Sequence, residues 1–209
     1  MNEKVNENRL EEITDLFYQS DYNIGGLMRH IFESDWFYAT ENVGSKIKSP
    51  VELMAGILKT LNVEFKNDLG LMFVQRALGQ VLFDPPNVAG WPGGKSWIDN
   101  STLMLRLNLV AYLLNSGDVN FKVKDDLKAK RSNKAFRRLM VEVDLNPLRN
   151  ALKSLPKEVL FDQLSTLLLQ ANPDIDKKFI DQVADATETD DYLKITLLGL
   201  MSLPEYPMC

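Results

Sequence analysis

The segment that most constrains this chain is the stretch 83–97, which reads FDPPNVAGWPGGKSW. It combines three prolines, three glycines and two tryptophans. Proline fixes φ and glycine permits positive φ, so this mixture specifies one irregular backbone path. Two tryptophans in such a segment need a surface to pack on or a ligand to bind. We therefore predict a long structured loop rather than a flexible linker.

The segments on both sides of the loop have the apolar spacing of amphipathic helices. The clearest helix start is Ser49-Pro50-Val51-Glu52, a capping box with proline at the first helical position. Asp21 is expected to cap the second helix, and Asn100 or Ser101 the fifth. The only short strand candidate is Leu139–Val143. The sequence predicts an all-α fold, an irregular bundle of about eight or nine helices. The expected helices cover 10–17, 24–31, 50–61, 67–82, 101–113 (with a stop at Gly117), 147–154, 157–170, 174–184 and 190–203.

Length and composition restrict the class of protein. A chain of 209 residues suits one domain, 1–209, and its net charge of −5 argues against general affinity for nucleic acid. The single cysteine, Cys209, excludes an internal disulfide and a cysteine-based metal cluster, although it could pair with another chain. No apolar run reaches the roughly 20 residues that span a bilayer. We expect no cofactor, no metal and no membrane span.

One internal segment has a charge opposite to that of the rest of the chain. Residues 118–145 are the least regular part of the sequence, and within them 122–138 carry a net charge of +6. This segment either binds an anionic partner or offsets the acidity of the remaining chain in solvent. Phe136 is its only aromatic residue, so the stacking surface for single-stranded nucleic acid is missing.

Three sequence patterns resemble catalytic or ligand-binding motifs but lack the neighbouring residues or secondary structure that those motifs require. Gly94-Lys95-Ser96 fits a relaxed phosphate loop, yet no strand enters it and Pro92 has no N–H to donate. His30 is the only histidine, and the sequence has no G-x-S-x-G motif that would supply a nucleophilic serine for it. Asn172, Asp174 and Asp176 imitate the start of a calcium loop that lacks its glycine and its final glutamate. We expect those oxygens to cap the following helix.

The candidate ligand-binding residues lie in or beside the loop: Asp84, Asn87, Trp91, Trp97 and Asp99. Asp84, Asp99 and Glu52 could supply a carboxylate pair for glycoside hydrolysis, although nothing in the sequence gives their separation. Trp91 and Trp97 either stack on sugar rings or anchor the loop as buried side chains. We expect buried anchors, with Trp91 the more buried, because Pro92-Gly93-Gly94 would let the backbone fold tightly over its ring.

Four stretches together resemble the bacterial domain-of-unknown-function 1800 family. They are 79–94 (GQVLFDPPNVAGWPGG) with the following Ser96-Trp97-Ile98, then SDWFY at 34–38, KIKSPVEL at 46–53 and LMSLPEYP at 200–207. The resemblance implies that the chain is the C-terminal part of a protein about twice as long. The absent N-terminal part would then hold an export signal or chemistry. The family has no assigned activity, so no catalytic residue is transferred from it.

From these observations we expect a non-catalytic helical module, structural or ligand-binding, of a larger bacterial protein. The resemblance suggests a setting in the cell envelope beside polysaccharides, with the remainder of the parent chain, a carbohydrate or a sulfatase-like protein as partner. The compartment is undetermined by the sequence, and export is expected if the parent chain carries a signal. One alternative is half of a hydrolase whose other site residues lie in the absent part. A second alternative is a polyanion binder acting through 122–138.

Overall fold

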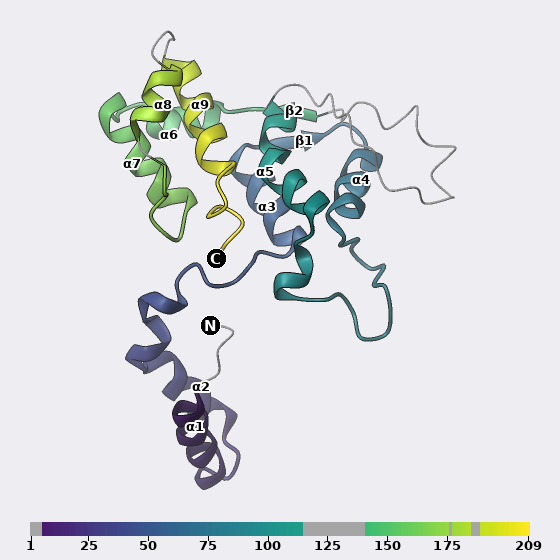
Figure 1. Cartoon of the computed structure of the whole chain (residues 1–209), viewed down its shortest axis with the longest axis vertical. Coiled ribbons are helices and arrows are strands. Elements are labelled where there is room, and N and C mark those ends of the chain that lie inside the picture. Colours follow the sequence, from purple (N-terminus) through teal and green to yellow (C-terminus); the bar gives the residue numbers. More distant parts are fainter. Residues whose placement is uncertain (1–5, 115–140, 176, 185–188) are drawn as a thin grey trace.

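The computed structural model describes residues 6–114, 141–175, 177–184 and 189–209. The predicted stop at Gly117 and the basic segment 122–138 lie outside these ranges. Within them the chain forms nine α-helices, three 3-10 helices and two short strands, which confirms the predicted all-α class (Figure 1). In order these are α1 (Glu7–Gln19), α2 (Ile24–Glu33), η1 (Asp35–Tyr38), η2 (Thr40–Asn42), α3 (Pro50–Thr60), β1 (Val63–Phe65), α4 (Asp68–Leu78), η3 (Gly94–Trp97), α5 (Asn100–Leu114), β2 (Val141–Val143), α6 (Asn146–Leu152), α7 (Lys157–Leu168), α8 (Lys177–Ala184) and α9 (Thr189–Met201).

Helix ends follow capping chemistry, which confirms some expected boundaries and corrects others. The capping box at α3 is present: Ser49 Oγ accepts from the Glu52 N–H at 3.3 Å, and Glu52 Oε2 accepts from the Ser49 N–H at 2.7 Å. The expectation that Asp21 caps the second helix was wrong, because Asn23 fills that position. The fourth helix was predicted to reach residue 82, but it ends at Leu78 because Gly79 takes a left-handed conformation at φ 91°.

The two strands join segments that are far apart in the sequence. β1 pairs antiparallel with β2, with Val63 opposite Val143 and Phe65 opposite Val141. The strand candidate Leu139–Val143 is confirmed over Val141–Val143, which form β2, and residues 139 and 140 lie outside the described ranges. β1 was not predicted. β1 alternates exposure along three residues between two helices, a pattern too short to stand out in a helical chain.

The hydrophobic core is built mainly from α3, α4, α5, α7 and α9. α9 packs against both α7 and α8, and it also contacts α5, so it connects the C-terminal helices to the central ones (Figure 1). We call the part of the structure built on this core the body. Fully buried side chains from each of these helices meet in one cluster; examples are Ile57, Leu78, Val110, Leu164 and Leu197. Burial of such side chains is the main source of stability for the body.

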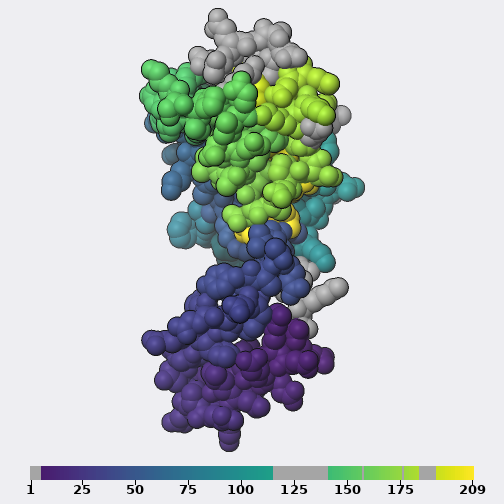
Figure 2. All heavy atoms as spheres, turned by 90° about the vertical axis from the view of Figure 1, so that its left-hand side faces the viewer, coloured from purple at the N-terminus to yellow at the C-terminus, as the bar shows by residue number. Residues whose placement is uncertain are grey.

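The first two helices form an arm outside this core. α1 and α2 pack on each other and contain no buried residue, and both views place them beyond the body (Figures 1 and 2). His30 Nε2 lies 3.0 Å from Glu12 Oε1 and links the two helices. Ile24, Met28 and Phe32 expose an apolar stripe along α2. A single domain over 1–209 stays a prediction. None of the described helices has the length and hydropathy required to span a bilayer.

Residues 46–48 and 206–209 are joined by backbone hydrogen bonds around an antiparallel bridge between Ile47 and Met208, and we call this pair of segments the clasp. The N–H and C=O of Lys46 bond to the backbone of Cys209 at 2.9 and 2.7 Å, and the Lys48 N–H donates to Pro207 O at 2.8 Å. On its other side the Lys48 carbonyl accepts from Arg106 Nη1 of α5 at 2.9 Å. The clasp therefore ties the start of α3, the middle of α5 and the last described residues together.

Tyr206→Ala tests whether the clasp contributes to global stability. The Tyr206 side chain is 3% exposed, and Lys48 Nζ lies 4.5 Å from the centre of its ring. We expect the substitution to lower the free energy of unfolding by about 3–5 kcal/mol, the usual cost of deleting a buried large aromatic side chain. Urea denaturation measures this loss. Tyr38→Ala is the matched control, since Tyr38 is 66% exposed, and an equal loss in both variants would contradict the prediction.

Candidate functional site

The segment that connects α4 to α5, residues 79–99, is held at its start by two glutamine side chains. It leaves the body as a long excursion in Figure 1. Gln75, buried on α4, accepts a hydrogen bond from the Leu82 N–H at 2.9 Å through Oε1. Gln80 Oε1 accepts from the Val51 N–H at 3.1 Å and so attaches the segment to the start of α3. We call this segment the α4–α5 loop.

Residues 82–89 form the tip of the loop, and all of them are exposed. Phe83 is 97% exposed and Val88 is fully exposed, so neither side chain packs on the body. The tip nevertheless has internal order: Asn87 Oδ1 accepts from the Ala89 N–H at 2.8 Å, and the Gly90 N–H donates to Asn87 O at 3.1 Å. Phe83 itself has φ 64°, a left-handed conformation that is strained for a residue with a Cβ.

The base of the loop contains the two tryptophans, and the predicted order of their burial was wrong. Trp97 is the buried one, at 8% exposed, whereas Trp91 is only half-buried. The expectation rested on Pro92-Gly93-Gly94, yet a Cβ built on Gly93 would meet no atom within 4 Å, so the backbone at that glycine is open rather than tightly packed. Trp97 instead lies directly before α5, where its carbonyl accepts from Thr102 Oγ1 at 3.0 Å.

Asp99 serves as the N-terminal cap of α5, the position expected for Asn100 or Ser101. Its Oδ1 accepts from the Ser101 hydroxyl at 2.6 Å and from the N–H groups of Ser101 and Thr102 at 2.8 Å each. The bond from the Ser101 hydroxyl, followed by the backbone bond from Thr102, lowers the pKa of Asp99 to about 2. This carboxylate is ionised at neutral pH and is used to hold the helix start.

Glu52 is occupied in a similar way at the start of α3. Its Oε1 accepts from Lys46 Nζ at 2.6 Å, and its Oε2 completes the capping box. The bond from Lys46 is the main reason that the pKa of Glu52 is lowered. A glycosidase pair needs one carboxyl group whose pKa is raised so that it can donate a proton. The pKa values of Asp99 and Glu52 both move in the opposite direction.

The phosphate-loop pattern and the calcium-loop pattern have structural roles where the structure describes their residues. Gly94–Trp97 forms η3 after an extended Gly93, so the strand–loop–helix arrangement of a phosphate site is missing there. The Asp174 N–H donates to Glu205 Oε1 at 3.2 Å, and Asp176 lies outside the described residues. Among the described residues, no cluster of three His, Cys, Asp or Glu side chains could hold a metal ion.

Two features of this region were missed by sequence reasoning. Phe83 and Val88 were not singled out, because their exposure depends on what the loop packs against, which the local sequence does not give. Arg106 was not singled out either, although its side chain is 0% exposed. Its Nε and Nη2 have no hydrogen-bond partner among the described residues, and burial lowers its pKa. The predicted binding roles of Asp84, Asn87, Trp91, Trp97 and Asp99 stay predictions.

Alanine substitution of each tryptophan measures how firmly the loop base is anchored. We expect Trp97→Ala to lower the free energy of unfolding by about 3–5 kcal/mol, since the side chain is buried. Trp91→Ala should cost clearly less, because a half-buried ring loses fewer contacts. Urea melts of both variants test this order. A larger loss for Trp91→Ala would show that the loop packs differently in solution.

Asp99→Ala tests the cap through its pH dependence. Because the pKa of Asp99 is lower in the folded protein than in the unfolded chain, its contribution is complete above the unfolded pKa and is lost as the pH falls toward about 2. At pH 7 we expect a loss of about 1 kcal/mol, the usual cost of removing a cap. Near pH 2 the variant and the parent should differ much less. Denaturant titrations at the two pH values give the comparison, and a pH-independent difference would contradict it.

Comparison with known proteins gives a family without a function. A family model described as "Protein of unknown function (DUF1800)" matches residues 1–208. Searches among curated proteins and among solved structures found no match to this chain.

Proposed function

The chain belongs to the DUF1800 family, and we propose that it is a non-catalytic binding module of a larger protein. In this proposal the tip of the α4–α5 loop contacts a protein surface through Phe83 and Val88. The carrying observation is that both apolar side chains are exposed on a backbone that hydrogen bonds hold in place. A preordered apolar contact loses little conformational entropy on binding.

The backbone of Phe83 supports this proposal independently of its exposure. A left-handed conformation costs a residue with a Cβ about 1–2 kcal/mol. The fully exposed side chain recovers none of this cost by packing on the body. The left-handed residue lies in a turn in which the Asp84 N–H donates to Val81 O at 3.1 Å, and strained backbone is frequent at binding and active sites. The strain turns an aromatic ring outward at the tip, where it can enter a pocket of a partner.

The partner that we propose for the tip is the remainder of a longer parent chain. Support comes from the chemistry of the tip, which offers two apolar side chains and a rigid Asp84-Pro85-Pro86 turn rather than a charged patch. Such a surface suits the packed interface between two parts of one protein. A carbohydrate or a sulfatase-like protein as partner, and a setting in the cell envelope, remain further hypotheses within this proposal.

The hydrolase half-site is retained as a second candidate because of Asp84. Among Asp84, Asp99 and Glu52, only the carboxylate of Asp84 accepts no hydrogen bond from another described residue. Residues from an absent part of the parent chain would have to complete such a site. Activity of the full-length protein on polysaccharide or sulfated substrates, lost in Asp84→Asn, would favour this candidate over the binding module.

Polyanion binding through 122–138 is a third candidate, and it rests on the local charge alone. The segment lies outside the described residues, so its support comes from the sequence. Salt-dependent retention on heparin that is abolished by charge reversal at Arg137 and Arg138 would favour it.

A photo-crosslinker at the tip tests the proposed contact. Phe83→p-benzoylphenylalanine in the longest native form of the protein should crosslink to one defined segment of the parent chain, mapped by mass spectrometry. The same replacement at Leu167, which is 64% exposed on α7, is the matched control and should not label that segment. Identical labelling from both positions, or no crosslink from position 83, would contradict the proposal.

Phe83→Gly separates a role in binding from a role in folding. Glycine accepts the left-handed conformation, although it also increases the freedom of the unfolded chain, so stability should change by less than about 1 kcal/mol. The contact with the partner should be weakened about tenfold or more, as for an aromatic hot spot. A large loss of stability, measured by urea denaturation, would instead assign Phe83 to the fold.

A further inference from the structure

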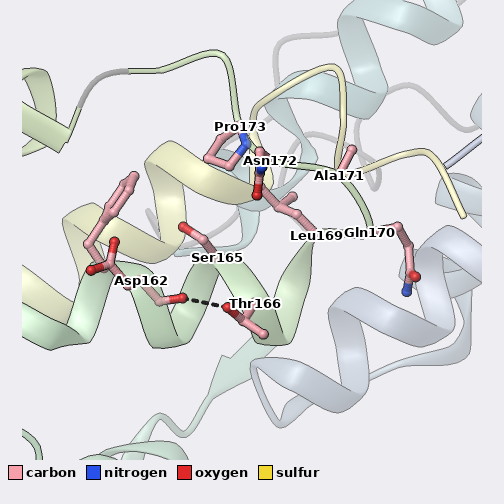
Figure 3. Close-up of a pocket in the computed structure, with 9 residues that line it drawn as sticks. Asp162, Ser165, Thr166, Leu169, Gln170, Ala171, Asn172 and Pro173 are labelled. Atoms are coloured by element: carbon pink, nitrogen blue, oxygen red, sulfur yellow. Dashed lines mark hydrogen bonds between the residues drawn. The ribbon is translucent and has the colours of Figure 1, made fainter. Parts of the chain in front are cut away.

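A pocket of about 460 Å³ lies along α7 (Figure 3). In Figure 1 this helix lies away from the α4–α5 loop. One wall is the face of α7 that carries Asp162, Ser165 and Thr166, which are neighbours at helical spacing. The other wall is the segment 169–173 that follows the helix and includes Gln170 and Asn172. The volume falls within the range of about 300–1,000 Å³ that is usual for small-molecule sites.

The polar side chains of this pocket have unused hydrogen-bonding capacity. Ser165 Oγ is shielded from solvent and has no partner among the described residues. Thr166 Oγ1 donates to the Asp162 carbonyl at 2.9 Å, which leaves its acceptor capacity free. The carboxylate of Asp162 and the amide of Asn172 form no hydrogen bond within the described structure. A shielded hydroxyl without a partner indicates a bound water or a ligand group at that wall.

The arrangement of these polar groups restricts the chemical class of ligand that the pocket can bind. Figure 3 shows Ser165 projecting from α7 toward the segment that carries Asn172, with Asp162 on the same face of the helix. Together they offer an acceptor-only carboxylate, a hydroxyl and an amide that both donates and accepts. Among the described residues that line the pocket, Asp162 is the only one with a charged side chain, and none of them is a lysine or an arginine. An anionic ligand would therefore meet repulsion without a compensating cation.

We propose that this pocket binds an uncharged sugar. Neighbouring hydroxyl groups of a sugar ring each donate and accept, so a single ring can bridge the Asp162 carboxylate, the Ser165 hydroxyl and the Asn172 amide. An extended peptide presents its N–H and C=O groups alternately along a strand and matches this compact set less well. A sugar of about a dozen heavy atoms in such a site should bind with a dissociation constant on the order of 1 mM.

The inference is tested by two-dimensional ¹⁵N NMR with named probes. Glucose, N-acetylglucosamine and cellobiose are titrated into the protein to about 50 mM, well above the expected dissociation constant. The backbone amide signals of 170–172 and the side-chain amide signal of Asn172 should shift and saturate, while the side-chain amide signal of Asn150, exposed on α6, should not move. The backbone signals report binding in the Asn172→Ala variant, which lacks the side-chain amide. Glucuronate and a blocked triglycine peptide serve as anionic and peptide probes and should bind at least about tenfold more weakly.

Variants assign the binding to the pocket. Asn172→Ala and Asp162→Asn should each weaken the sugar about tenfold, the effect of losing one good hydrogen bond. Asn150→Ala is the matched control and should bind like the parent. Ser165→Ala should fold with at least parental stability, because it removes a shielded hydroxyl that lacks a partner, and yet bind more weakly.

Three outcomes would overturn the inference: no shift with any sugar, binding that Asn172→Ala and Asp162→Asn leave unchanged, or equal binding of glucuronate or the peptide. Because the pocket and the loop tip are separate surfaces, failure here leaves the proposed contact of Phe83 unaffected. Failure of the crosslinking experiment likewise leaves this inference unaffected.

Discussion

The hydrogen bond from the buried Arg106 guanidinium to the Lys48 carbonyl is the interaction on which the arrangement of the body depends. A buried charge is costly unless it is hydrogen-bonded, so this carbonyl is a strongly held partner. Lys48 is also bonded to the 206–209 side of the clasp, and the capping box of α3 begins at the next residue, Ser49. One cation thus sets the position of three segments that are far apart in the sequence.

This constraint explains why the α4–α5 loop has a rigid base and a free tip. α3 is fixed by the clasp and holds the loop through the bond from Val51 to Gln80, while α5 begins at the Asp99 cap. Between these attachments the residues 82–89 contact little of the body. The carboxylates beside the loop, Glu52 and Asp99, are used to start helices. The arrangement favours presentation of a surface over acid–base chemistry.

The pocket along α7 has the opposite character to the loop tip. The tip presents apolar side chains outward, whereas the pocket is an open hollow that places an exposed amide and an exposed carboxylate beside a shielded hydroxyl. Their different chemistry suits different ligands, a protein surface for Phe83 and an uncharged sugar for Asp162 and Asn172. The pocket has one wall on α7, which packs in the core, and the loop tip is attached to α4 and α3 through Gln75 and Gln80.

What the sequence determined by itself was local. The capping box at Ser49, the helical class and the structured nature of the loop follow from residues close together in the chain, because capping and backbone preference act over three or four positions. Tertiary structure alone decided the burial of Trp97 rather than Trp91, the pairing of β1 with β2 and the enclosure of Arg106. Burial and strand pairing depend on segments that meet only after folding, and a single sequence carries no local signal for them.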